Sequence, residues 1–99
     1  MKKIKKFPLV IFGAGEIAGL AKYYFDQDSP YEVVAFTVDD IYCETDTFEN
    51  LPLIAWSQVE KKFPPSDFNM HVALSYVKLN QLRQEKYEQV KAAGYKLAS

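Results

Sequence analysis

The sequence predicts an α/β fold: a small open parallel sheet of about five strands with three helices. Short apolar runs typical of buried strands alternate with segments in which apolar residues recur at helical spacing. Three of the four glycines lie within seven residues, directly between the first strand-like segment and the first helix-like segment. With 99 residues, 48% of them hydrophobic, the chain has the size of a single domain spanning 1–99.

The first half of the chain alternates strand, helix and strand. Residues 7–12 form an apolar run, as expected for a central parallel strand that is buried on both faces. Over 16–26, apolar residues recur at i, i+3, i+4, i+7 and i+8, which predicts a helix that ends at Asp28-Ser29-Pro30. Residues 33–38 form a second apolar run, for which we predict a second buried strand.

The middle of the chain is acidic and less regular. Residues 39–50 lack periodicity and carry five carboxylates, which predicts a long surface loop before a short strand at 53–55. Ser57 and Glu60 have the spacing of a capping box. This spacing predicts a helix that begins at Ser57 and ends before Pro64.

The remaining segments repeat the alternation. We expect a fourth strand at 70–74, a third helix over 79–93 ended by Gly94 in the left-handed conformation, and a fifth strand at 95–97. In this helix, Lys86 is expected to contribute only its aliphatic stem. Right-handed crossovers give the strand order 3-2-1-4-5, with a ligand site beyond the carboxyl ends of the strands, between strands one and four.

The glycine-rich turn has the form G-x-G-x-x-A, which is typical of Rossmann-like nucleotide-binding domains. Gly13 would allow the tight turn, Gly15 would let a phosphate approach the backbone, and Ala18 would let the helix pack closely on the sheet. Asp39 follows the second strand, where an acidic residue accepts hydrogen bonds from a ribose or base. Both features also have purely structural explanations, since tight turns favour glycine and strand ends favour aspartate.

The charge distribution argues against a polyanionic partner. The net charge is −1, but residues 1–22 sum to +4, residues 23–60 to −9 and residues 61–99 to +4. Because the middle repels polyanions and the basic residues are scattered, we expect no binding to nucleic acid. No apolar run reaches the roughly 18 to 20 residues that span a bilayer, and no secretory cleavage pattern follows the basic N-terminus. A cytoplasmic protein without a membrane partner is expected.

Cys43 and His71 are the single cysteine and the single histidine of the chain. They supply too few ligands for a zinc site and no base for a nucleophile, so we predict neither a metal site nor a catalytic residue. Cys43 is interpreted as an unpaired thiol, and His71 as a packed or hydrogen-bonded residue of a strand.

Several short motifs, spread over the chain, carry a resemblance to a known family. They are IFGAG at 11–15, VAFTVD at 34–39, LPLI at 51–54, VALS at 72–75, the pair Asn80 and Arg83, and GYKLAS at 94–99. Together they resemble the N-terminal domain of bacterial sugar O- and N-acyltransferases, which acetylate nucleotide-linked amino sugars or sialic acids.

The resemblance implies a division of labour between two domains. In that family, a small Rossmann-like N-terminal domain binds the nucleotide sugar, here expected to be UDP- or dTDP-linked. A C-terminal left-handed β-helix of hexapeptide repeats binds acetyl-CoA, forms a homotrimer and carries the catalytic histidine. The present sequence contains no hexapeptide repeat. We therefore expect an N-terminal domain that is monomeric or weakly oligomeric, without a cofactor or catalysis of its own, and acetyl-CoA as co-substrate of the full-length enzyme.

The resemblance places the nucleotide sugar against the glycine turn, the end of the second strand and the end of the fourth strand. The residues concerned are Gly13, Ala14, Gly15, Asp39, Ser75 and Tyr76. Asn80 and Arg83 match an Asn-x-x-Arg motif of the family, with a structural role slightly favoured. Where the family often has Gly-Gly-His, this chain has Gly15-Glu16-Ile17, which brings a carboxylate close to the expected phosphate site.

Two other functions are compatible with the sequence. One is a regulatory domain that binds NAD(P) or CoA without catalysis, and the other is an assembly domain whose pocket has decayed. The short second half of the fold and the lack of residues for hydride chemistry count against NAD. Ligand binding separates the three hypotheses, whereas the base, the sugar and the choice of O- or N-acylation do not follow from the sequence.

Overall fold

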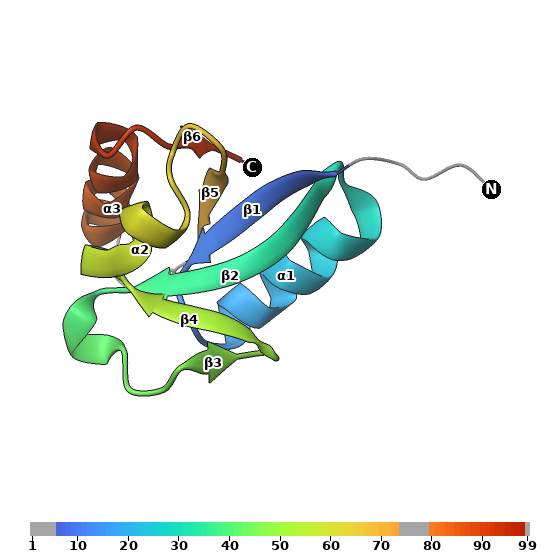
Figure 1. Cartoon of the computed structure of the whole chain (residues 1–99), viewed down its shortest axis with the longest axis horizontal. Helices are drawn as coiled ribbons and strands as arrows, with labels where there is room; N and C mark the ends of the chain where they lie inside the picture. The colour runs from blue at the N-terminus through green and yellow to red at the C-terminus, as the bar shows by residue number, and fades with distance from the viewer. Residues whose placement is uncertain (1–5, 74–79, 99) are drawn as a thin grey trace.

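The computed structural model describes residues 6–73 and 80–98 and confirms the predicted α/β class (Figure 1). In chain order, the elements are β1 (Phe7–Phe12), α1 (Glu16–Asp28), β2 (Tyr31–Val38), the 3₁₀ turn η1 (Asp40–Tyr42), β3 (Thr47–Phe48), β4 (Leu51–Ala55), α2 (Trp56–Lys62), β5 (Asn69–Val72), α3 (Asn80–Ala92) and β6 (Lys96–Leu97).

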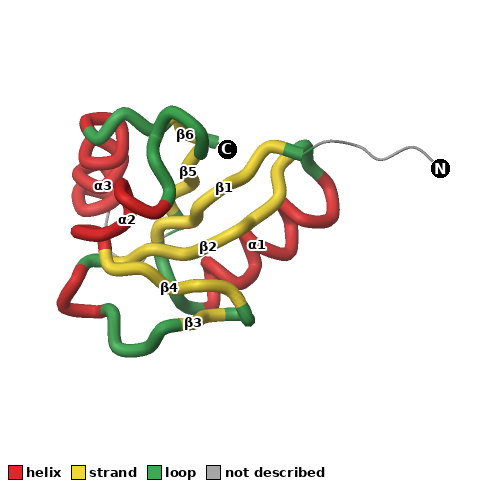
Figure 2. The backbone as a smooth tube through the Cα atoms, viewed as in Figure 1, coloured by secondary structure: helices red, strands yellow, loops and turns green. Residues whose placement is uncertain are grey.

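The described sheet has six strands in the order β3-β4-β2-β1-β5-β6. All neighbours pair in parallel except β3 and β4, which are antiparallel. Without β3, the order is the 3-2-1-4-5 that the sequence predicts. Figure 2 shows β3 as an additional short edge strand beside β4, so the prediction of five parallel strands was wrong by this one strand.

The prediction of one long loop at 39–50 was also wrong, because this segment contains η1 and β3. β3 and β4 are joined by Glu49 and Asn50, whose φ angles are 52° and 65°. Positive φ at both central residues is what a two-residue hairpin turn of type I′ requires. Phe48 then packs edge-on against Phe36 of β2, with ring centroids 4.8 Å apart. This contact ties the hairpin to the sheet.

Side chains of β1 alternate between two apolar layers. Leu9 and Ile11 belong to a buried cluster with Phe25 of α1, whereas Val10 and Phe12 belong to a second cluster that includes residues of α2 and α3. α1 therefore covers one face of the sheet, and α2 with α3 covers the other (Figure 1). As expected for a central strand, β1 is buried on both faces.

The capping box predicted for Ser57 and Glu60 does not form. α2 begins one residue earlier, at Trp56, and its N-cap residue, Ala55, makes no side-chain cap. Ser57 thus lies inside the first turn, where its N–H donates to Oδ1 of Asp40 in η1 at 3.0 Å. The cap comes from a distant carboxylate, which local spacing cannot reveal.

Other boundaries differ slightly from the predictions. α1 runs on to Asp28, and β2 begins at Tyr31, two residues before the predicted start. Gly94 has a φ of 103° directly after α3, as predicted. Leu74 and Leu79, the predicted end of the fourth strand and start of the third helix, lie outside the described residues.

His71 lies in β5, as expected, with its Nδ1 2.8 Å from the carbonyl oxygen of Ala98. Its ring packs edge-on against Phe25 at 4.9 Å. The prediction of a packed, hydrogen-bonded strand histidine is confirmed. Within residues 6–73 and 80–98, no helix combines the length and the apolar character needed to cross a membrane.

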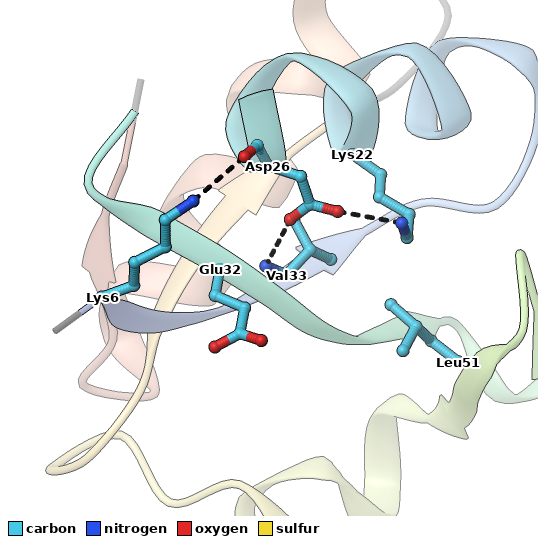
Figure 3. A pocket seen from close by; sticks show the side chains of 6 residues that line it. All are labelled: Lys6, Lys22, Asp26, Glu32, Val33 and Leu51. Carbon is cyan, nitrogen blue, oxygen red and sulfur yellow. Dashed lines mark hydrogen bonds and ion pairs between the residues drawn. The ribbon is translucent and has the colours of Figure 1, made fainter. Parts of the chain in front are cut away.

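Asp26 links α1 to the N-terminal part of β2. Its Oδ1 accepts a hydrogen bond from the N–H of Val33 at 3.1 Å, and its Oδ2 pairs with Lys22 at 2.9 Å. Lys6 donates to the backbone oxygen of Asp26 at 3.0 Å, near the end of α1. Figure 3 shows the two lysines converging on Asp26 beside a groove of about 550 Å³. Because these polar groups satisfy one another, we assign the cluster a structural role.

We expect Asp26→Ala to lower the free energy of unfolding by about 1–3 kcal/mol, because the buried N–H of Val33 loses its acceptor. Asp26→Asn keeps an acceptor oxygen and loses only a partly exposed ion pair, which is worth about 0–1 kcal/mol. Urea unfolding of the two variants measures the difference. Equal losses in both would show that the ion pair, not the hydrogen bond to β2, carries the stabilisation.

Tyr95 joins the end of α3 to the end of α2. The residue is buried, and its Oη donates to the carbonyl oxygen of Phe63 at 2.5 Å. Burial, with a smaller contribution from the negative charge of Glu60, raises the pKa of Tyr95 to about 12. The fold therefore favours the neutral phenol.

Because of this raised pKa, the free energy of unfolding should depend on pH in the alkaline range. The contribution of Tyr95 to that free energy should be complete below its ordinary pKa of 10.0 and should be lost as the pH rises towards about 12. Urea unfolding between these pH values should show a steeper loss for the wild type than for Tyr95→Phe. Tyr23→Phe, at an exposed position of α1, is the control. Identical pH profiles for the wild type and Tyr95→Phe would contradict this expectation.

Candidate functional site

A cavity of about 340 Å³ lies at the carboxyl ends of β1 and β2. It is lined by Phe12, Gly13, Ala14, Val38, Asp39, Tyr42 and Lys86. The structure thus brings together three of the residues expected at a ligand site, Gly13, Ala14 and Asp39. Ser75 and Tyr76 lie outside the described residues, and the description does not extend to the side chains of Asn80 and Arg83.

Gly13 is required by the backbone around it. Its φ is 135°, and its N–H donates to the carbonyl oxygen of Thr37 at 2.8 Å. A Cβ at this position would collide with the carbonyl oxygen of Ala73. Ala73 in turn donates its N–H to the carbonyl oxygen of Phe12 at 2.8 Å. Gly13 therefore lets the chain after β5 close against β1, in addition to any contact with a ligand.

Gly15 differs from Gly13 in its surroundings. It occupies the N-cap position of α1, and, apart from its chain neighbours, no atom of the described residues lies within 4 Å of the place that a Cβ would take. No described side chain caps this helix. The first-turn N–H groups of this 13-residue helix lack acceptors within the helix, and together with the helix dipole they favour an anion. Glu16, exposed in the first turn, adds a negative charge that opposes a bound phosphate.

Asp39 forms an ion pair with Lys86 of α3. Lys86 Nζ lies 2.6 Å from Oδ2 of Asp39, and the two side chains are 15% and 33% exposed. The ammonium also lies 5.4 Å from the ring centroid of Phe12 and 3.4 Å from Oε1 of Gln89. The expectation that Lys86 contributes only its aliphatic stem was wrong, since its charged end reaches the cavity.

Lys86 is the cavity residue that the sequence reasoning missed, although a signal was present. It falls on the apolar stripe of its helix, together with Tyr87 and Val90. A cation on the inward side of an amphipathic helix needs a counterion nearby, and Asp39 stood at the edge of the sheet where ligands bind. Because the two charges pair, they add no net charge to the lining of the cavity.

Asp40, the neighbour of Ile41 and Tyr42 in η1, binds Ser57 of α2 and so positions η1 beside the cavity. The hydroxyl of Ser57 and, to a smaller extent, its N–H hold the pKa of the Asp40 carboxyl below its ordinary value of 3.8. The N–H groups of Tyr42 and Cys43 close η1 by donating to the carbonyl oxygens of Asp39 and Asp40 at 2.9 and 3.1 Å. These bonds fix η1 between the end of β2 and the start of α2.

The described part of the chain contains no group of three or more His, Cys, Asp or Glu residues that could hold a metal ion. Cys43 is a free thiol near the carbonyl oxygens of Thr45 and Leu53. Among the described residues, the polar side chains that line the cavity are those of Asp39, Tyr42 and Lys86. Such a set suits hydrogen bonding to a bound organic molecule.

Comparison with solved structures finds proteins of similar fold, among them three with different functions. An acetyltransferase domain, that of PglB from Neisseria gonorrhoeae FA1090, is 22% identical with a TM-score of 0.68, over 89% of this chain and 40% of that chain. RSP, a Rex-family repressor, is 14% identical with a TM-score of 0.65, over 92% of this chain and 43% of that chain. The methyltransferase FkbM from Methylobacillus flagellatus KT is 16% identical with a TM-score of 0.68, over 95% of this chain and 24% of that chain.

These similarities show a shared fold, which three proteins of different function use. The chain spans less than half the length of each of the three. No protein-family model matches the sequence, and no curated protein matches it. The fold alone therefore does not specify a function.

We expect Gly13→Ala to lower the free energy of unfolding by about 2 kcal/mol or more, because the positive φ and the carbonyl of Ala73 both oppose a side chain. Gly19→Ala is the matched control. There, a Cβ would meet only the carboxylate of Glu49, a flexible group that can move aside, while alanine favours the helix. Urea unfolding of both variants measures the difference, and a fully stable Gly13→Ala variant would contradict the geometry.

Proposed function

We propose that this domain binds a nucleotide-linked sugar, UDP- or dTDP-linked, and acts as the N-terminal domain of a sugar acyltransferase. The observation that carries the proposal is the cavity at the carboxyl ends of β1 and β2, where the Gly13–Ala14 backbone meets the Asp39–Lys86 ion pair next to the open start of α1. The similarity in fold to the acetyltransferase domain of PglB supports it.

The ion pair suits the base or ribose of such a ligand. The carboxylate of Asp39 accepts hydrogen bonds and the ammonium of Lys86 donates them, so the two present an acceptor beside a donor. A base edge or a pair of ribose hydroxyls offers the complementary arrangement. Because the two charges cancel, this end of the cavity favours an uncharged part of the ligand.

The start of α1 suits the diphosphate. Ala14 lines the cavity and Gly15 follows at the open N-cap, so a ligand held at Asp39 can extend towards the first-turn N–H groups. Glu16 weakens this anion site, which favours modest affinity and a ligand whose binding energy comes largely from the base end.

Acyl transfer itself would require residues outside the cavity described here. His71, the one histidine of the sequence, is engaged by Ala98 and Phe25 within the sheet and does not line the cavity. We therefore propose that this chain contributes substrate binding, and that acetyl-CoA and the catalytic base belong to another part of a larger, trimeric cytoplasmic enzyme.

The proposal is tested by titrating the 99-residue chain with UDP-N-acetylglucosamine and with NAD. Two-dimensional NMR spectra recorded at each ligand concentration monitor the binding. We expect amide shifts at residues 13–18 and 39–42 with the nucleotide sugar and a Kd on the order of 0.1–1 mM. Lys86→Met should weaken binding about tenfold, because the ligand loses a donor and Asp39 loses its counterion. Lys91→Met, which removes an exposed lysine from the same helix, should leave affinity unchanged.

Two results would overturn the proposal. Shifts at residues 13–18 with NAD but none with the nucleotide sugar would assign the domain to the NAD-binding class. Equal weakening by Lys86→Met and Lys91→Met would show that the effect is one of net charge and not of the ion pair in the cavity.

A further inference from the structure

Tyr42 is a large side chain that faces the cavity without being part of the core. It lines the cavity, and its side chain is 66% exposed. In the described residues, ring pairs join Phe12 to Trp56 and Phe36 to Phe48, among others, but none of these pairs includes Tyr42. Much of the surface of Tyr42 is therefore accessible to a ligand.

The backbone under Tyr42 is held more firmly than its exposure alone would suggest. The 3₁₀ turn η1 closes through the hydrogen bond from the N–H of Tyr42 to the carbonyl oxygen of Asp39 at 2.9 Å. The carboxylate of the adjacent Asp40 is bound to the N–H of Ser57 at 3.0 Å, which fastens η1 to α2. An exposed aromatic ring on a fastened turn loses little conformational entropy when a ligand packs on it.

The other walls of the cavity leave space for a flat ring. Gly13 and Ala14 present backbone and a single methyl group, while Phe12 is 2% exposed and packs against Trp56, with ring centroids 5.4 Å apart. The polar groups of Asp39 and Lys86 also line this space. A largely apolar cavity with an acceptor and a donor in its wall is complementary to a planar heterocycle with hydrogen-bonding groups on its edge.

We infer that Tyr42 is the stacking platform for the base of the bound nucleotide, and that the Asp39–Lys86 pair meets the edge of that base. This inference rests on the proposed function and deepens it. It assigns the cavity to the base and leaves the diphosphate to the start of α1. Affinity then depends on an aromatic base, so that a ligand with phosphates alone gains nothing from Tyr42.

The test uses the 99-residue chain with UDP and with inorganic pyrophosphate, which lacks a base. We expect Tyr42→Ala to weaken UDP binding about tenfold, in line with the usual contribution of one base–aromatic stack. Tyr42→Phe keeps the ring and should stay within about threefold of the wild type. Pyrophosphate binding should be the same in all variants.

Ile41→Ala is the matched control, because Ile41 is the neighbouring residue of η1, is 78% exposed and does not line the cavity. Tyr42 and Ile41 are both exposed, so neither substitution removes core packing, and circular dichroism should show intact folds. Isothermal titration calorimetry of each variant with UDP gives the affinities, and Ile41→Ala should bind as the wild type does.

The outcomes separate the two proposals. Wild-type affinity for UDP in Tyr42→Ala would overturn the stacking role and leave the proposed function standing. Equal weakening in Ile41→Ala and Tyr42→Ala would also overturn it, since the effect would then belong to η1 as a whole. Failure of the wild type to bind UDP would overturn both. If the wild type bound NAD and not UDP, and Tyr42→Ala weakened that binding, the stacking role of Tyr42 would be upheld. The proposal that the ligand is a nucleotide sugar would then be overturned.

Discussion

The contact between Gly13 and Ala73 is the constraint on which the rest of the molecule depends. At this point, backbone groups of β1, β2 and the chain after β5 approach so closely that a single Cβ would push them apart. The contact holds the three central strands in register at their carboxyl ends and sets the direction in which α1 leaves the sheet. The cavity lies directly beside this contact, and Gly13 itself lines it.

The cavity combines elements that are far apart in the sequence. Asp39 comes from the end of β2, Tyr42 from η1 and Lys86 from the middle of α3, yet the three line one space of about 340 Å³. Two of the three have a further support: the ring of Phe12 lies beside Lys86, and the bond from Ser57 to Asp40 holds η1, which carries Tyr42. A site whose lining residues are themselves fastened can bind a ligand with little reorganisation.

The sequence was informative where local physics decides the structure. The apolar run of β1, the stripe of α1 and the glycine after α3 each follow from period or backbone freedom, and the structure has them as predicted. The β3–β4 hairpin was missed because Glu49 and Asn50 adopt positive φ without the glycine that normally announces such a turn. The start of α2 was missed because its cap, Asp40, is 17 residues away in the sequence. Lys86 was misjudged for the same reason, since its partner Asp39 is 47 residues away.

The central position of β1 determines when the cavity can form. β1 pairs with β2 across one short helix, but its other neighbour, β5, comes much later in the chain, with Ile11 opposite His71. Pairing across such a separation is slow, because loop closure costs entropy before any contact forms. Lys86 lies in α3, after β5 in the chain. The segment from β1 to β2 alone therefore supplies only part of the lining of the cavity. A ligand that needs the whole cavity binds only the completed fold and, at a concentration a hundredfold above its Kd, stabilises it against unfolding by about 2.7 kcal/mol.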